Sequence, residues 1–219
     1  MKPFVAWELV RRGHLVRSLR LAPLVTTVAA VAAFLLARRG DTHDAIGDLR
    51  VLGLLLALGT GYALDDGAAI TLQASPYSLA RRHWLRLGCA LAVVIPLWTA
   101  ILAHFLPSAP AENRWRLGLG LTVELAAALA VIWAVAAWGR RYGFDHPGII
   151  TTPTLLAFLL LTVSIPEAPM LVGFGPQWTE AHLRWSGILV AATCLLVAAM
   201  RDPAARWRAT GPPPRQAGG

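Results

Sequence analysis

Glu124 is the side chain most suggestive of chemistry, because it is a carboxylate inside a long apolar run. A charge at membrane depth is costly and by default marks a functional site with a partner. Seven residues separate Glu124 from Leu117, which begins the run; a helix therefore places Glu124 about 10 Å below that end. His104, near the end of the preceding run, is expected at a similar level. A Glu124–His104 contact would gate protons or bind a polar substrate group; the alternative is a protonated or snorkelling glutamate in a helix interface.

Asp65 and Asp66 form a second candidate, an acidic pair followed by Gly67. The pair is similar to the start of the motif of metal-dependent lipid-headgroup transferases, which require further aspartates at fixed spacing. The next aspartate is Asp145, and two adjacent carboxylates supply too few oxygen ligands for Mg²⁺. We therefore expect no metal site. The other histidines match no zinc spacing and are expected in loops or at lipid headgroups: His14, His43, His83, His146 and His182.

Basic residues number 20 against 12 acidic ones, and Lys2 is the only lysine. A phosphate-binding loop of the GxxxxGK[ST] kind needs a lysine, so we expect no ATP hydrolysis by that route and no cofactor in this chain. An intramembrane enzyme is also the least favoured class, because the sequence shows no nucleophile–base pair or metal cluster. The positive charge is typical of contact with anionic lipid headgroups, and we see no nucleic-acid-binding motif.

The elements that must position these residues are apolar runs. The chain is 56% hydrophobic and 15% charged, whereas a soluble domain carries about 25% charged residues. Each run is expected to be a helix, because backbone amides in lipid must be satisfied internally. The predicted fold is all-α, a polytopic membrane protein with six transmembrane helices at 21–37, 49–64, 85–106, 117–138, 148–165 and 183–200. Residues 1–20 are predicted to form an interfacial amphipathic helix, 21–200 the transmembrane domain and 201–219 a disordered cytoplasmic tail.

The distribution of basic residues predicts the orientation. With both termini and the connections after spans two and four in the cytoplasm, that side holds fourteen of the 20 basic residues. The positive-inside rule therefore favours cytoplasmic termini. Tryptophans near the expected boundaries fit two aromatic belts at headgroup depth: Trp7, Trp84, Trp138 and Trp207 inside, and Trp115, Trp178 and Trp185 outside.

The connection after the second span has its own pattern. Asp65 and Asp66 end a membrane helix, and a short helix-like segment follows. Ser75-Pro76 then breaks that segment, because proline disfavours helix for the residue before it. Arg81 and Arg82 begin the third span.

This connection resembles the cytoplasmic loop of ATP-binding-cassette (ABC) export permeases of the second exporter class. In that family an acid-rich helix end leads to a Gly-Thr-Leu-like segment, a Ser-Pro-x-Ser turn and an arginine. The matching positions are Thr71, Leu72, Ser75, Pro76, Ser78 and Arg81. The interfacial N-terminal helix, with Glu8 and its arginines, and the long outer segment 166–184 are also similar to the family's architecture.

The resemblance implies that a separate ATPase subunit, carrying ATP and Mg²⁺, docks on the connection. The implied docking residues are Asp65, Asp66, Thr71, Leu72, Ser75, Pro76, Ser78, Arg81 and Arg82. A second copy or a homologue would complete the translocation path in the plasma membrane. The alternative is an autonomous carrier, or an accessory scaffold protein, that uses intramembrane Glu124. Substitution of Glu124 would disable a carrier, whereas disruption of Ser75-Pro76 would disable an exporter subunit.

Overall fold

The computed structural model describes residues 21–37, 45–65, 79–144, 146–164 and 170–201. Every regular element in these ranges is a helix, as the all-α class predicts. The long helices are α2 (Leu21–Ala37), α3 (Ala45–Thr60), α4 (Leu79–Phe105), α5 (Arg114–Arg141), α6 (Gly148–Ser164) and α7 (Trp178–Met200). Short 3-10 helices extend α3 and α4 and precede α5: η1 (Gly61–Leu64), η2 (Leu106–Ser108) and η3 (Ala111–Asn113).

Four helical stretches in the described ranges are long and apolar enough to cross a membrane, which indicates a membrane protein. They are Ala45–Leu64, His83–Ser108, Ala111–Arg141 and Trp178–Met200. The two other long helices, α2 and α6, have 17 residues each, or about 26 Å of helix. Their apolar parts, Val25–Leu35 and Gly148–Thr162, are shorter still.

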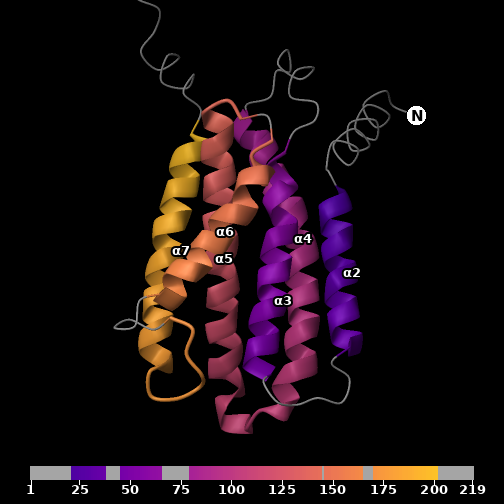
Figure 1. The fold of residues 1–219 in the computed structure, drawn as a ribbon, viewed down its shortest axis with the longest axis vertical. Coiled ribbons are helices and arrows are strands. Elements are labelled where there is room, and N and C mark those ends of the chain that lie inside the picture. Colours follow the sequence, from indigo (N-terminus) through magenta and orange to yellow (C-terminus); the bar gives the residue numbers. More distant parts are fainter. Residues whose placement is uncertain (1–20, 38–44, 66–78, 145, 165–169, 202–219) are drawn as a thin grey trace, which may run out of the picture.

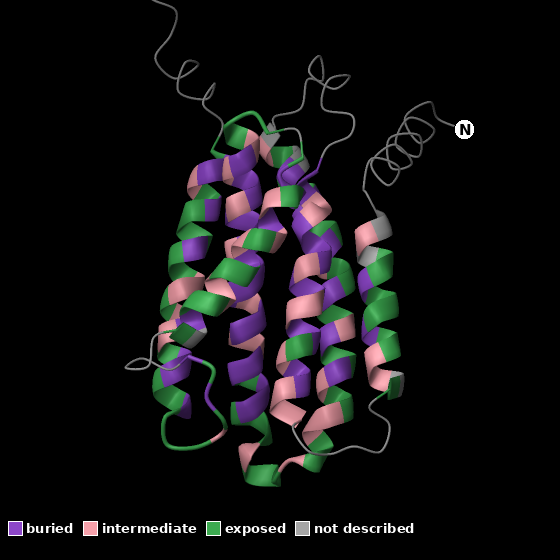
Figure 2. Ribbon diagram, viewed as in Figure 1, coloured by how far each residue is buried: buried purple, intermediate pink, exposed green. Residues whose placement is uncertain are grey.

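The helices form a bundle in which α5 is central (Figure 1). α5 packs most extensively against α7, and it also contacts α3 and α6. Buried residues run along its whole length, whereas α2, α4 and α6 expose apolar side chains on their outer faces (Figure 2). An apolar outer surface is what a lipid solvent requires, because lipid tails are as apolar as leucine.

Successive helices alternate in direction, which defines two ends of the bundle (Figure 1). One end, here called the Asp65 end, holds the start of α2, the exit from η1, the start of α4, the turn between α5 and α6, and the end of α7. The other end holds residues 106–113. Gly143, with φ of 88°, allows α5 to end in a Schellman turn in which Phe144 N donates to Gly139 O at 3.0 Å.

Most predicted helix positions agree with the structure, but α3, α4 and α7 begin well before their apolar runs. α3 begins at Ala45 rather than residue 49, α4 at Leu79 rather than residue 85, and α7 at Trp178 rather than residue 183. All three helices therefore include polar residues that lie outside the predicted apolar runs. The predicted interfacial helix at 1–20 and, apart from Arg201, the tail predicted at 201–219 lie outside the described residues.

Candidate functional site

The predicted docking residues fall into two groups. Asp66, Thr71, Leu72, Ser75, Pro76 and Ser78 lie outside the described residues. Arg81 and Arg82 lie in the first turn of α4, where Arg81 is exposed, and Asp65 directly follows η1. The structure therefore describes the two edges of the predicted docking connection.

Asp65 joins three helices at the edge of that connection. Its side chain is buried, and Oδ1 accepts a hydrogen bond from the backbone N–H of Gly148 at 2.8 Å. Its backbone carbonyl accepts from Nη1 of the buried Arg86 at 3.0 Å. Asp65 thus connects the end of η1 to α4 and to the N-terminus of α6, where a carboxylate also complements the helix dipole. These three residues are called the Asp65 contact below.

Glycine is required at Gly148 for this geometry. A Cβ added there would lie 2.5 Å from the ring of Tyr62 and 3.1 Å from Oδ1 of Asp65. The backbone N–H can approach the carboxylate because no side chain intervenes. His83, expected in a headgroup environment, is instead buried beside this region in α4.

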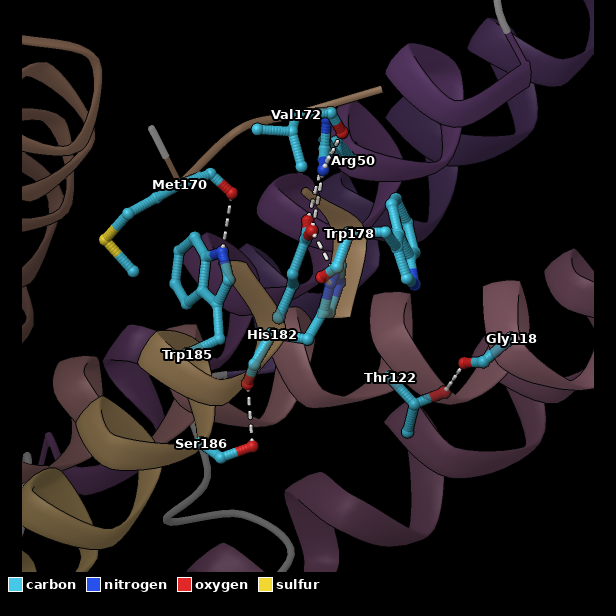
Figure 3. A network of polar contacts seen from close by, with 10 residues as sticks. Arg50, Gly118, Thr122, Met170, Val172, Trp178, His182, Trp185 and Ser186 are labelled. Carbon is cyan, nitrogen blue, oxygen red and sulfur yellow. Dashed lines mark hydrogen bonds and ion pairs between the residues drawn. The ribbon is translucent and has the colours of Figure 1, made fainter. Parts of the chain in front are cut away.

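Glu124 forms the main charged contact inside the bundle. Nε and Nη2 of Arg50 donate to its two carboxylate oxygens at 2.8 and 2.7 Å, a bidentate arrangement (Figure 3). Nη2 of Arg50 also donates to the carbonyl of Val172 at 2.9 Å. Charge-assisted bidentate pairs are the strongest protein hydrogen bonds, so Arg50 firmly connects α3 to α5 and to the segment before α7.

His182 adds the third member. Its Nδ1 donates to the carbonyl of Trp178 at 2.7 Å, because a carbonyl can only accept. That bond directs Nε2 toward Glu124, whose Oε1 lies 3.0 Å away. Glu124, Arg50 and His182 are called the Glu124 cluster below. They come from α5, α3 and α7, and all three lie toward the 106–113 end of the bundle.

Gly120 makes the close approach of α7 to α5 possible. An added Cβ would lie 2.6 Å from the ring of Trp178 and 2.7 Å from Nε2 of His182. The rings of Trp178 and His182 themselves are in contact, with centroids 4.0 Å apart and planes tilted by 34°. The absent side chain at Gly120 therefore lets the imidazole reach the level of Glu124, one helical turn further along α5.

The expected partner of Glu124 was wrong. Within the described residues, Glu124 pairs with Arg50 and His182. His104 is exposed, and the centroid of its ring lies 5.1 Å from that of Phe105. The count of basic residues leaves Arg50 among the six on the outer side, and the sequence predicts His182 in a loop or at lipid headgroups. A signal existed for Arg50, because it directly follows Leu49, the first residue of the predicted second span.

Two tryptophans assigned to the outer aromatic belt also lie inside the bundle. Trp178 and Trp185 are 3% and 2% exposed, whereas Trp115 is 68% exposed and fits the belt. Nε1 of Trp185 donates to the carbonyl of Met170 at 3.0 Å. Together with the Arg50–Val172 bond, this contact holds the non-helical segment 170–177 against the bundle (Figure 3).

Glu124, Arg50 and His182 contact one another through charged and hydrogen-bonding atoms. The described residues include no group of three metal-ligating side chains. A buried ion pair contributes little net stability to the fold. Removal of one partner nevertheless destabilises the folded protein strongly, because the other charge stays buried without a counter-ion. The cluster therefore adds a charged connection between α3, α5 and α7 to the packing of these helices.

The comparisons with known proteins identify no relative. No family model, no curated protein and no solved structure matches the chain.

Proposed function

We propose that the chain is the membrane subunit of an ABC-type exporter, with α2 to α7 as six transmembrane helices and both termini in the cytoplasm. The observation that carries this proposal is the position of the connection between η1 and α4. It leaves and re-enters the bundle at the Asp65 end, where the described chain also begins and ends (Figure 1). A docking loop and two cytoplasmic termini require that arrangement.

The charges of the Asp65 end support its assignment to the cytoplasm. Arg81, Arg86, Arg140, Arg141 and Arg201 lie at this end. Arginine and lysine are enriched in cytoplasmic connections of membrane proteins. At about 26 Å, α2 and α6 cross a bilayer core of about 30 Å with modest local thinning or snorkelling of flanking residues.

The Asp65 contact supplies a mechanical route from the docking connection into the bundle. Movement of the segment that follows Asp65 shifts the carboxylate that caps α6 and the carbonyl that binds Arg86 in α4. The permease itself forms and breaks no covalent bond in this mechanism. ATP binding on the partner would change the ATPase's relative affinity for two arrangements of the bundle, and only that difference moves the equilibrium.

Co-purification tests the proposal. The tagged chain, extracted from cells that also express the products of neighbouring genes, is expected to retain an ATPase subunit. A Ser75→Arg, Pro76→Arg variant should lose that subunit while the bundle keeps its thermal stability. A matched control, Glu112→Arg at the opposite end, should retain it. If wild-type chain retains no ATPase under conditions that keep the membrane complex intact, the proposal is contradicted.

The Glu124 cluster favours a second candidate, an autonomous proton-coupled carrier. A carboxylate shared between an arginine and a histidine from different helices is an arrangement that a bound proton or substrate would rearrange. A carrier is expected to lose transport in the Glu124→Gln variant and to transport without any partner. An exporter subunit is expected to lose transport in the Ser75/Pro76 variant and to depend on the partner's ATP hydrolysis.

A further inference from the structure

The imidazole of His182 lies between two groups that accept protons in hydrogen bonds (Figure 3). Nδ1 donates to the carbonyl of Trp178 at 2.7 Å, and Nε2 lies 3.0 Å from Oε1 of Glu124. Nε2 is buried and makes no well-aligned hydrogen bond within the described residues, so its contact with Oε1 is an ion pair. A neutral imidazole has one N–H group and one lone pair. With the N–H group at Nδ1, a neutral ring would place its lone pair beside a carboxylate oxygen. The arrangement therefore requires one further proton, on His182 or on Glu124.

Arg50 places that proton on His182. Nε and Nη2 of Arg50 donate to the two carboxylate oxygens of Glu124 at 2.8 and 2.7 Å. An ionised carboxylate accepts at both oxygens, which is the form that a bidentate arginine favours. Arginine itself keeps its proton in proteins. His182 is therefore the member of the Glu124 cluster that gains and loses a proton.

His182 is surrounded by few groups that titrate near neutral pH. The charged or titratable residues around it are Asp48 and Arg50 in α3, His104 in α4, Arg116 and Glu124 in α5, and the Glu180–Arg184 pair in α7 itself. The sequences of α6 and of segment 170–177 contain no charged residue. Histidine is the side chain whose charge ordinarily changes between about pH 5 and 8. Within this group, the exposed His104 is the other histidine, and it supplies a control.

Close packing opposes rotation of the His182 ring. The ring centroid lies 4.0 Å from that of Trp178, and a Cβ added at Gly120 would lie 2.7 Å from Nε2. Loss of the proton would make the contact with Glu124 repulsive, and movement of the start of α7 would relieve that repulsion. Segment 170–177 leads directly into α7, and Arg50 binds both Glu124 and the carbonyl of Val172. A shift at His182 would therefore reach this segment.

We propose that the Glu124 cluster is a proton-binding site, with the proton on Nε2 of His182, and that release of this proton loosens the start of α7 and segment 170–177 from α5. The arrangement that binds the proton is favoured at low pH and is weakened as the pH rises through the titration of His182. The inference goes beyond both proposed functions. It concerns the bundle alone and needs neither an ATPase nor a transported substrate.

Maleimide labelling of the purified chain in phosphatidylcholine nanodiscs tests the coupling. Cys89 and Cys194 are first replaced by serine. Val172→Cys, at a buried position, reports opening of the segment, and Gly173→Cys, at an exposed one, corrects for the ordinary rise of thiol reactivity with pH. The ratio of the labelling rate at position 172 to that at position 173 should rise about five- to ten-fold between about pH 6 and 9.

Three variants assign this response to one side chain. His182→Gln removes the titrating group, so the ratio should become independent of pH. His182→Lys keeps a positive charge beside Glu124 over this range, so the ratio should stay low throughout. His104→Gln removes the exposed histidine at the same end of the bundle and should retain the wild-type response. Circular dichroism checks that each variant is folded.

Nitrogen NMR of the unsubstituted chain, with its histidine rings labelled, gives a readout that depends on no variant's packing. The signal of His182 is the one missing from the His182→Gln spectrum. At about pH 6 both of its ring nitrogens should carry protons, and one proton should leave over the range in which the labelling ratio rises.

Three results would overturn the proposal. They are a labelling ratio that does not change with pH in the chain with His182 intact, a pH response that persists in His182→Gln, and a single protonated ring nitrogen on His182 at the lower pH. Because the ATPase is absent throughout, the exporter proposal can fail while this one holds.

Discussion

The Asp65 contact and the Glu124 cluster both place a buried carboxylate where three helices meet, but they use different partners. Asp65 acts through backbone groups, since its side chain accepts from the N–H of Gly148 and its own carbonyl accepts from Arg86. Glu124 acts through the side chains of Arg50 and His182. These bonds of the Asp65 contact thus involve backbone groups, whereas those of the Glu124 cluster join charged side chains. That difference gives the two regions different sensitivities to substitution.

The largest expected effect is at Glu124. Glu124→Gln leaves the charge of Arg50 buried without a counter-ion, which should cost about 3–5 kcal/mol in the free energy of unfolding. Denaturant titration in mixed micelles, followed by far-UV circular dichroism, measures the loss. The Arg50→Gln, Glu124→Gln double variant removes both charges and should recover most of it. A loss below about 1 kcal/mol would show that the pair is solvated, as exposed ion pairs are.

The next largest effect is expected at Gly120. Gly120→Ala places a methyl group 2.7 Å from Nε2 of His182, so α7 must shift, at a cost of about 1–3 kcal/mol. Gly88 provides the control, because an added Cβ there meets nothing within 4 Å. Gly88→Ala should stabilise α4 by about 0.5–1 kcal/mol. Equal effects of the two substitutions on the thermal midpoint would contradict the close packing of α7 on α5.

A smaller effect is expected at Asp65. Asp65→Ala removes the acceptor for the N–H of Gly148 and should cost about 1 kcal/mol, as for loss of a helix N-cap. Asp65→Asn keeps an oxygen at that position and should cost less than half as much. At Glu124 the amide substitution, Glu124→Gln, is expected to cost about 3–5 kcal/mol. The cost of an amide substitution relative to an alanine substitution at the same position therefore distinguishes the two regions. A severe Asp65→Asn effect would mean that charge dominates there as well.

The smallest effect is expected at Trp185. Trp185→Phe loses the hydrogen bond to the carbonyl of Met170, worth about 1 kcal/mol or less. The segment 170–177 should then exchange its amide hydrogens faster, because Trp185 and Arg50 supply the two side-chain hydrogen bonds from the described helices to its carbonyls, and one of them is lost. Trp115→Phe, on an exposed side chain, is the control and should change neither stability nor exchange. Unchanged exchange in both variants would show that Trp185 does not hold the segment.

The sequence predicts the helices better than it predicts the site. Apolar runs locate α2 and α6 nearly to the residue, because their boundaries coincide with changes in composition. The Glu124 cluster is missed because Arg50, the second residue of its apolar run, counts as a charge at the outer boundary, and His182 lies one residue before the predicted start of its run. Glu124 itself is recognisable, since a carboxylate within an apolar run stands out. Its partners depend on how α3 and α7 pack against α5, which no local pattern encodes.

The two buried tryptophans illustrate the same limit. Trp178 and Trp115 both lie near the predicted outer boundary, yet one is buried and the other exposed. The difference comes from Gly120, which opens a space on α5 that Trp178 occupies. Distance along the chain from a span's end predicts the depth of a side chain, but not the side of the helix on which a neighbour packs.

Substituted-cysteine labelling at the two ends determines whether the Asp65 end faces the cytoplasm, on which the proposed ATPase docking depends. Ser75→Cys and Ser108→Cys would be made after Cys89 and Cys194, both exposed, are replaced by serine. In intact cells, a membrane-impermeant maleimide is expected to label the variant at position 108, and to label the one at position 75 only after permeabilisation. Labelling at position 75 in intact cells, with position 108 protected, would contradict the account and remove the basis for ATPase docking.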